Sequence, residues 1–196
     1  MNKGYLVVFL IIFFVIVGFL VYKAKQKINL PTGKVTQTEE IAGQSGTMQT
    51  PITGKPQIKI TTTQGDFTIE LRPDVAPKTV ANYLSKFSTG FCQNLTWHRV
   101  EDWVVQGCDP KGDGTGGESN LPTETSNESF LIGAVGVARK ASPKEFSNDS
   151  QFFIVKKDSQ FLDGEYTYFG KVVAGMDIVN KIQVGDKIIS TLILSK

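Results

Sequence analysis

The part of the sequence that most restricts the fold begins at Gln57, where apolar and polar residues start to alternate. The alternation runs through 58–62, breaks at the turn Gln64-Gly65, and resumes through 67–71. A period of two places every second side chain on the same face of a strand, so each run predicts a strand with one buried face. Two such runs separated by a glycine turn predict an antiparallel hairpin.

Five more short apolar runs follow, each bounded by Gly, Asp, Asn or Ser. They lie at 103–105, 134–138, 152–155, 168–173 and 188–194. Pro77 opens a helical pattern whose apolar residues recur every three or four positions up to Phe87, with Gly90 beyond its end. A second short helix is predicted at 176–182. Many short strands with two helices predict a mainly β fold, a closed antiparallel barrel whose ends are covered by the helices.

A different pattern occupies the N-terminus, where Tyr5 to Tyr22 is a stretch of eighteen residues without a charge. That length is the lower end of what crosses a hydrocarbon core of about 30 Å, and a tyrosine at each end suits the membrane interface. A cleaved signal peptide is the alternative, but the following Lys-Ala-Lys-Gln-Lys offers no small-x-small cleavage site. We therefore predict one transmembrane anchor over residues 1–22, in contact with the bilayer through residues 5–22.

Residues 23–56 contain no Phe or Trp and are rich in Thr, Gln, Gly and Lys, which predicts a flexible linker before a folded domain at 57–196. Charge differs between the two halves of the chain. The first 56 residues carry six Lys against two Glu, whereas the remainder carries 15 Lys and Arg against 17 Asp and Glu. The folded part is slightly acidic, so we expect no nucleic-acid partner.

Cysteine and histidine are scarce, since the chain has only Cys92, Cys108 and His98. A zinc site of Cys and His ligands needs about four of them, so no metal is expected. A serine-hydrolase triad would have to use His98, and no G-x-S-x-G motif accompanies it. The two cysteines lie sixteen positions apart, and the sequence leaves open whether they form a disulfide or remain as buried thiols.

Six short strings between Trp97 and Val172 resemble those of the cyclophilin family of peptidyl-prolyl cis-trans isomerases in their order and approximate spacing. They are W-H-R-V at 97–100, V-V-Q-G-C-D-P at 104–110, G-T-G-G at 114–117, S-Q-F-F-I at 150–154, F-L-D-G at 161–164 and F-G-K-V at 169–172. The hairpin at 57–71 and A-P-K-T-V-A-N-Y at 76–83 are similar as well, so the resemblance covers the folded part. It implies an eight-stranded antiparallel barrel capped by two helices, with no metal and no cofactor.

The resemblance implies that Arg99 is the main catalytic residue, and that Gln106 and Gln151 hold the substrate carbonyl and orient the arginine. Rotation of a prolyl bond requires neither a nucleophile nor a metal. It requires a donor that meets the twisted amide better than the planar one, and an apolar slot for the ring. A guanidinium is always charged and offers several fixed N–H groups, which fits the donor role.

The resemblance also assigns the substrate-binding residues. It implies a proline slot lined by Trp103, Val104, Phe153, Phe161 and Leu162. Ala138 and Arg139 match an exposed strand edge that pairs with the substrate backbone. Tyr166 stands where many relatives carry His, and His98 is implied to pack against the site without transferring a proton.

The sequence departs from the common family pattern at four places. The interval between the arginine of W-H-R-V and the glutamine of V-V-Q-G is one residue shorter, so Trp103 could be displaced by one position in the slot. Phe161 replaces a Trp with which many relatives bind cyclosporin, so we expect weak sensitivity to that drug. Cys108 replaces a Gly, and the loop at 139–147 is longer than in eukaryotic members.

We expect the domain to accelerate the rotation of X-Pro bonds in unfolded or flexible protein segments, and so to assist folding as a monomer. The alternative is a non-catalytic tethered chaperone or proline-peptide binding module on the same fold. Arg99 together with both glutamines favours the enzyme. Lysines on the two sides of the anchor differ too little to fix its orientation. We expect a single-pass membrane protein whose domain lies outside the cytoplasm.

Overall fold

The structure, a computed structural model, describes residues 54–195. The predicted anchor over residues 1–22, and the predicted linker over residues 23–56 apart from its last three positions, lie outside the described residues. Within residues 54–195, no helix combines the length and the apolar character needed to cross a membrane.

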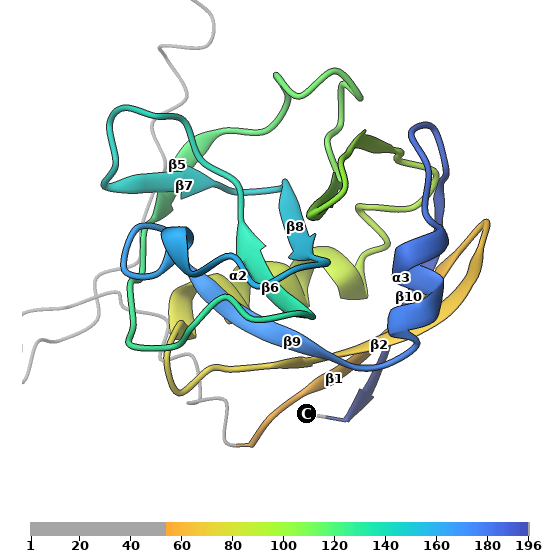
Figure 1. The fold of residues 1–196 in the computed structure, drawn as a ribbon, viewed down its shortest axis with the longest axis horizontal. Helices are drawn as coiled ribbons and strands as arrows, with labels where there is room; N and C mark the ends of the chain where they lie inside the picture. Colours follow the sequence, from red (N-terminus) through yellow and green to blue (C-terminus); the bar gives the residue numbers. More distant parts are fainter. Residues whose placement is uncertain (1–53, 196) are drawn as a thin grey trace, which may run out of the picture. The chain divides into compact units, whose positions relative to one another are not determined.

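Eight strands form one antiparallel sheet that makes up most of the described part (Figure 1). In sheet order they are β10 (Ile188–Ser195), β1 (Gln57–Thr62), β2 (Gly65–Leu71), β9 (Tyr168–Ala174), β6 (Ala134–Val137), β8 (Phe152–Val155), β4 (Val104–Gly107) and β3 (Trp97–Val100). The predicted hairpin at 57–71 is present as β1 and β2. The mainly β fold and the apolar runs predicted as strands are confirmed.

The sheet curls into a half-barrel, and the closed barrel predicted from the sequence is wrong. The two edge strands, β10 and β3, share no ladder. The segments around their first residues are joined by an isolated bridge between Thr96 and Lys187 and by four backbone hydrogen bonds, such as Trp97 N–H to Asp186 O at 2.8 Å. The reason is local backbone geometry. Turns occupy 89–94, and Asn94 takes φ +64, so the chain becomes extended only just before β3 begins.

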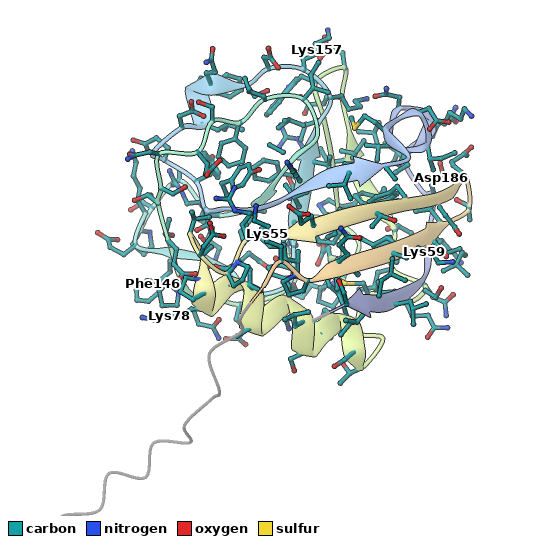
Figure 2. All side chains as sticks on the ribbon, turned by 90° about the horizontal axis from the view of Figure 1, so that it is seen from below. Lys55, Lys59, Lys78, Phe146, Lys157 and Asp186 are labelled. Carbon is teal, nitrogen blue, oxygen red and sulfur yellow. A yellow bond between two sulfur atoms is a disulfide. The ribbon has the colours of Figure 1, made fainter. Side chains whose placement is uncertain are left out.

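Alternation in the β1–β2 hairpin separates a buried face from a solvated one, as the sequence predicted. Ile58 and Ile60 are fully buried, and burial of such a side chain contributes about 1.5–3 kcal/mol. Lys59 lies between them in the sequence and projects outward, where it pairs with Asp66 of β2 at 3.2 Å (Figure 2). A slip of one residue would exchange these faces, so the pattern fixes the register.

Both predicted helices are present. α2 (Pro77–Ser88) passes behind the sheet in Figure 1, and α3 (Met176–Lys181) lies close to β2. Pro77 suits the first turn of α2 because its fixed φ is already helical. No side chain caps this helix from its own N-cap position. Instead the carboxylate of Glu124 accepts the N–H groups of Lys78 and Thr79 at 3.1 and 2.8 Å.

The central strands β4, β6 and β8 bury side chains on both faces. On the inner face, Val105 and Ile154 belong to the main core. On the outer face, Val104 and Phe153 belong to a second, smaller cluster with Leu162. Neighbours along a strand point to opposite faces, so the outer face carries every second residue of these strands. The candidate site is built on this outer face.

Two short strands were missed by the sequence analysis. β5 (Ser119–Pro122) and β7 (Phe146–Asn148) pair with each other in a separate two-stranded sheet. Their sequences, S-N-L-P and F-S-N, show no apolar alternation. A short 3-10 helix, η1 (Gln160–Leu162), was not predicted either.

Cys92 and Cys108 form a disulfide, with their Cα atoms 5.0 Å apart. Both residues are fully buried, and the bond joins the turns after α2 to the residue that follows β4. Cys108 takes φ +62, in the left-handed region that favours glycine. That conformation explains why glycine suits this position in the family that the sequence resembles. The choice that the sequence left open is therefore resolved in favour of the disulfide.

Candidate active site

Four residues lie directly opposite one another across four strands: Arg99 on β3, Gln106 on β4, Phe153 on β8 and Gly136 on β6. Directly opposite residues share a face, so the row places a guanidinium, an amide and a phenyl ring side by side. A Cβ at Gly136 would collide with the rings of Phe153 and Phe130. The glycine therefore makes room for the phenyl ring in the row.

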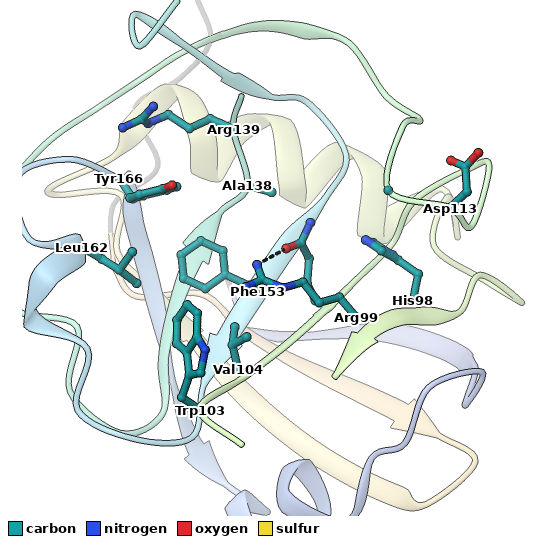
Figure 3. Close-up of a pocket in the computed structure, with 12 residues that line it drawn as sticks. His98, Arg99, Trp103, Val104, Asp113, Ala138, Arg139, Phe153, Leu162 and Tyr166 are labelled. Atoms are coloured by element: carbon teal, nitrogen blue, oxygen red, sulfur yellow. Dashed lines mark hydrogen bonds between the residues drawn. The ribbon is translucent and has the colours of Figure 1, made fainter. Parts of the chain in front are cut away.

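A cavity of about 400 Å³ opens over this row (Figure 3). It is lined by His98, Arg99, Trp103, Val104, Gln106, Asp113, Gly114, Ala138, Arg139, Phe153, Leu162 and Tyr166. A cavity of this size, with an apolar wall and a few polar groups, holds a small ligand or a few residues of a peptide.

Arg99 is held from two sides at the edge of the cavity. Its Nε donates to Glu101 Oε1 at 2.8 Å, and its Nη1 donates to Gln106 Oε1 at 3.3 Å. The guanidinium carbon lies 5.3 Å from the centre of the Trp103 ring. Among residues 54–195, Nη2 has no hydrogen-bond partner, so an N–H edge of the arginine is left for a ligand.

Gln151 fixes the orientation of Gln106 from behind. It is buried, and its Nε2 donates to the carbonyls of Gly116 and Gly114 at 2.7 and 3.1 Å. Its Oε1 is then the group that accepts from Gln106 Nε2, at 2.8 Å. Because the amide nitrogen of Gln106 is used in this way, its oxygen is the end that faces Arg99. The chain of bonds therefore runs from the backbone of the glycine-rich loop to the guanidinium.

Aromatic and aliphatic side chains form the other wall of the cavity. The Phe153 ring meets the Tyr166 ring edge to face, with centroids 5.9 Å apart. Val104, Leu162 and Trp103 complete this wall in Figure 3. The wall offers a ring-sized apolar surface beside a charged N–H donor, which is the combination that a prolyl amide requires.

The predicted strand edge at Ala138 and Arg139 is only half available. The N–H of Ala138 donates to Gln151 O at 3.0 Å, and its C=O accepts from Asn148 N–H at 2.8 Å. The Ala138 backbone is therefore engaged within the protein, while the residue itself still lines the cavity. In the described part of the chain, the backbone N–H and C=O of Arg139 have no partner.

The Arg139 side chain is nearly buried, with 4% of its surface exposed. Its guanidinium lies over the Tyr166 ring at 4.5 Å, and it donates to the Glu165 backbone oxygen and carboxylate at 3.0 and 3.1 Å. These contacts hold the backbone of Arg139 against the cavity and tie the loop after β6 to the segment after η1.

His98 lines the cavity next to Arg99, and neither ring nitrogen has a hydrogen-bond partner among the described residues. Burial lowers the pKa of His98 below its usual value of 6.5. The charge of Arg99 lowers it further, while Asp109 and Asp113 partly oppose the shift. The imidazole is therefore neutral at pH 7.

Ten of the twelve residues predicted for the site line the cavity, and two do not. Gln151 lies behind Gln106, and Phe161 is 69% exposed at the rim, where its ring packs edge to face on Trp103 at 5.2 Å. Trp103 itself lines the cavity despite the shorter hairpin. Asp113 and Gly114 were missed, although Gly114 opens the G-T-G-G string.

Within residues 54–195, no cluster of three or more His, Cys, Asp or Glu side chains is placed to hold a metal ion. The cavity presents the fixed guanidinium of Arg99 and the amide of Gln106 beside an apolar wall, and the amide of Gln151 supports them from behind. Such a set can bind a carbonyl and a ring, and can stabilise charge that appears on a twisted amide.

Comparison with protein families and curated proteins finds matches that span the folded part of the chain. The family model described as "Cyclophilin type peptidyl-prolyl cis-trans isomerase/CLD" matches residues 57–191. A Brucella suis protein named "Probable peptidyl-prolyl cis-trans isomerase" is 39% identical over 158 residues, covering 72% of this chain and 80% of that one. The Arabidopsis thaliana "Peptidyl-prolyl cis-trans isomerase CYP18-2" is 36% identical over 132 residues, covering 65% and 80%.

Solved structures give the same result. A crystal structure of a Cryptosporidium parvum cyclophilin type peptidyl-prolyl cis-trans isomerase matches with a TM-score of 0.67 and 28% identity, covering 73% of this chain and 99% of that one. The same protein in the presence of the dipeptide Ala-Pro matches with a TM-score of 0.65 and 30% identity, covering 71% and 99%.

Proposed function

The chain belongs to the cyclophilin family and is a peptidyl-prolyl cis-trans isomerase, and we propose that Arg99 is the donor that accelerates the bond rotation. The observation that carries this proposal is the position of Arg99. Its guanidinium is fixed at Nε and Nη1, and its Nη2 is left without a protein partner among residues 54–195, beside an apolar wall.

The chemistry of the amide explains why a fixed donor suffices. Rotation about an X-Pro bond breaks the C–N resonance and meets a barrier of about 18–20 kcal/mol. In the twisted form the nitrogen regains a lone pair that the planar form lacks. A donor aimed at that lone pair binds the transition state more strongly than the ground state, which is the condition for catalysis. No covalent bond is made or broken, and no proton is transferred.

The surrounding residues take the remaining roles in this proposal. Phe153, with Val104, Leu162, Trp103 and Tyr166 around it, holds the proline ring. Gln106 orients Arg99 and contacts the substrate carbonyl, while Gln151 holds Gln106 in place. The free backbone groups of Arg139 pair with the substrate chain, in the manner of strand addition.

We infer that the substrates are proline-containing segments of unfolded or flexible proteins, whose isomerisation assists folding. A cavity of about 400 Å³ has room for a few residues of a peptide, and a relative was crystallised in the presence of Ala-Pro. We propose that the domain acts as a monomer.

The test is the exchange rate of an Ala-Pro peptide measured by NMR, with the purified full chain and its variants. Arg99→Ala should lower kcat/KM by about a hundredfold, the usual loss when one preorganised donor is removed. The Arg99→Lys variant keeps the positive charge but lacks the planar guanidinium. Its kcat/KM should therefore lie between those of the wild type and Arg99→Ala. An active Arg99→Ala variant would reject the donor role. An inactive wild type that still binds the peptide would favour the non-catalytic binding module.

We also propose that the chain is anchored in a membrane by residues 5–22, with its isomerase domain outside the cytoplasm. The uncharged stretch supports the anchor. The buried disulfide supports an oxidising compartment, because such bonds are rare in the cytosol. Protease added to intact cells should then remove the domain. Protection of the domain until the cells are lysed would contradict this orientation.

A further inference from the structure

Glu101 lies outside the cavity lining, yet it contacts two residues that line it. We infer that Glu101 is a positioning residue that holds Arg99 and Trp103 in the geometry needed for prolyl isomerisation. This inference rests on the proposed function of Arg99, and it adds a carboxylate to the set of residues on which that function depends.

The Glu101 carboxylate accepts hydrogen bonds from two residues of the site, the proposed donor Arg99 and the wall residue Trp103. Its Oε1 accepts from Arg99 Nε at 2.8 Å, and its Oε2 accepts from Trp103 Nε1–H at 2.8 Å. The guanidinium carbon then lies 5.3 Å from the Trp103 ring centre. We call these three residues the hairpin clamp. Through it, the donor and the apolar wall are held by the same group.

The clamp follows from the local sequence of the β3–β4 hairpin. Arg99 and Glu101 are alternate residues on one arm of the hairpin, so their side chains share a face, and Trp103 follows in the bend at 102–103. Glu101 N–H donates to Val104 O at 2.8 Å, which continues the ladder to the very tip of the hairpin. The two-residue bend at 102–103 places the Glu101 carboxylate between the Arg99 and Trp103 side chains.

The attraction between Arg99 and Glu101 alone would do little to hold the arginine, because an exposed ion pair contributes about 0–1 kcal/mol of stability. The Arg99 and Glu101 side chains are 41% and 45% exposed, so their attraction is screened by solvent. The effect of Glu101 therefore lies in geometry. It blocks rotation of the guanidinium about its last bonds and leaves the Nη2 side for the substrate. The pKa of Glu101 is lowered, first by its bond to Arg99, so the carboxylate is ionised at neutral pH.

The test compares Glu101→Gln with Asp102→Asn in the full chain. Each donor now meets its own carboxylate oxygen, so the Glu101→Gln side chain keeps an acceptor towards one donor and turns an NH2 group, which cannot accept, towards the other. We expect a decrease of about tenfold in kcat/KM on an Ala-Pro peptide.

Asp102 is the matched control. It loses the same charge at the next position, its side chain is 74% exposed, and it pairs only with Lys157 at 2.7 Å among residues 54–195. Its variant should stay within about twofold of the wild type.

A double-mutant cycle shows whether Glu101 acts through Arg99. In an Arg99→Ala background, adding Glu101→Gln should cause a clearly smaller loss than the tenfold expected in the wild type, because only Trp103 is then left to be positioned. The Trp103 Nε1–H resonance should also shift in Glu101→Gln and remain in place in Asp102→Asn. Equal rates for Glu101→Gln and Asp102→Asn would overturn the inference, and so would a full tenfold loss in the Arg99→Ala background. An inactive wild type would instead reject the proposed function.

Discussion

Arg99 and Gln106 face each other across the β3–β4 hairpin, and the arginine Nη1 donates to the glutamine Oε1 at 3.3 Å. The nitrogen of the same amide donates to Gln151, whose own nitrogen donates to the carbonyl of Gly116 at 2.7 Å. The orientation of the proposed donor therefore depends on a buried amide that does not line the cavity. Catalysis should be sensitive to that amide even without contact with the substrate.

The first prediction concerns Gln151→Leu. This substitution keeps the side-chain volume and removes the hydrogen bonds that join Gln151 to Gln106 and to the glycine carbonyls. Gln106 would then be free to turn its nitrogen towards Arg99, and kcat/KM should fall by about tenfold. The Gly114 carbonyl would lose the Gln151 donor, while the Gly116 carbonyl keeps its bond from Asn148, so the free energy of unfolding should fall by about 1–3 kcal/mol. NMR exchange on an Ala-Pro peptide and urea denaturation measure the two effects. Gln183→Leu, at an exposed position outside the cavity, is the control and should change neither quantity.

The second prediction concerns the single histidine. Burial holds the pKa of His98 below its usual 6.5, so the unfolded chain takes up this proton first as the pH falls. The free energy of unfolding is therefore highest above about pH 6.5 and should decline towards the folded-state pKa. His98→Asn should remove this part of the decline. Denaturation at pH 7.5 and pH 5.5, with each protein, measures it.

The same proton should also affect the rate, because an imidazolium beside Arg99 repels the guanidinium. The wild type should lose activity on acidification over this range, and His98→Asn should lose less. Since the chain has one histidine, its ring resonances titrate without overlap. A titration midpoint at or above 6.5 would contradict the burial that the structure shows around this ring.

Most of the fold was predictable because its strands alternate clearly and its helices have distinct ends. Ile58 and Ile60 mark the inner face of β1, and Pro77 marks the start of α2. β5 and β7 were not predictable, because their pairing depends on residues far apart in the sequence. The sequence also did not show that β3 and β10 form no ladder with each other. The missing ladder depends on the left-handed backbone at Asn94, which the residue type permits but does not require.

The site was predicted largely through the family resemblance, which supplied Arg99 and both glutamines. Hydrogen bonds to the backbone could not be read from that pattern. The engagement of the Ala138 backbone became visible only in the structure. Glu101 was missed because an exposed acidic residue at a hairpin tip has no distinctive sequence signal. Its role depends on distances to two side chains, which only the structure gives.

The third prediction concerns the disulfide between Cys92 and Cys108. It closes a loop with a sequence separation of 16, for which its loss should lower the free energy of unfolding by about 3 kcal/mol. Cys108 also has φ +62, so the replacement residue matters. A Cys92→Ala/Cys108→Gly variant should be about 1 kcal/mol more stable than Cys92→Ala/Cys108→Ala, because glycine adopts that backbone without strain. Urea denaturation compares the two variants.

A reducing agent provides the control for the disulfide. It should destabilise the wild type and leave both double variants unchanged, since they have no bond to lose. If the wild type is equally stable with and without the reductant, while a thiol assay on the unfolded chain shows full reduction, the disulfide does not contribute as predicted.

The fourth prediction concerns Gly136, whose missing side chain makes room for Phe153. An added methyl group would collide with the Phe153 ring and also with Phe130. Gly136→Ala should therefore push Phe153 into the cavity and raise KM for an Ala-Pro peptide. Arg99 and Gln106 are not displaced, so kcat should change less. Overpacking should also lower the free energy of unfolding by about 1–3 kcal/mol.

A second substitution separates the two effects of Gly136→Ala. In a Phe153→Leu background the added methyl group meets a smaller side chain, so its cost to the free energy of unfolding should shrink. The contact with Phe130 remains, so the cost should not vanish. A Gly136→Ala variant with an unchanged KM and a strongly reduced kcat would show that the methyl group disturbs the donor instead. The wall that Phe153 forms would then not be where the proline ring binds.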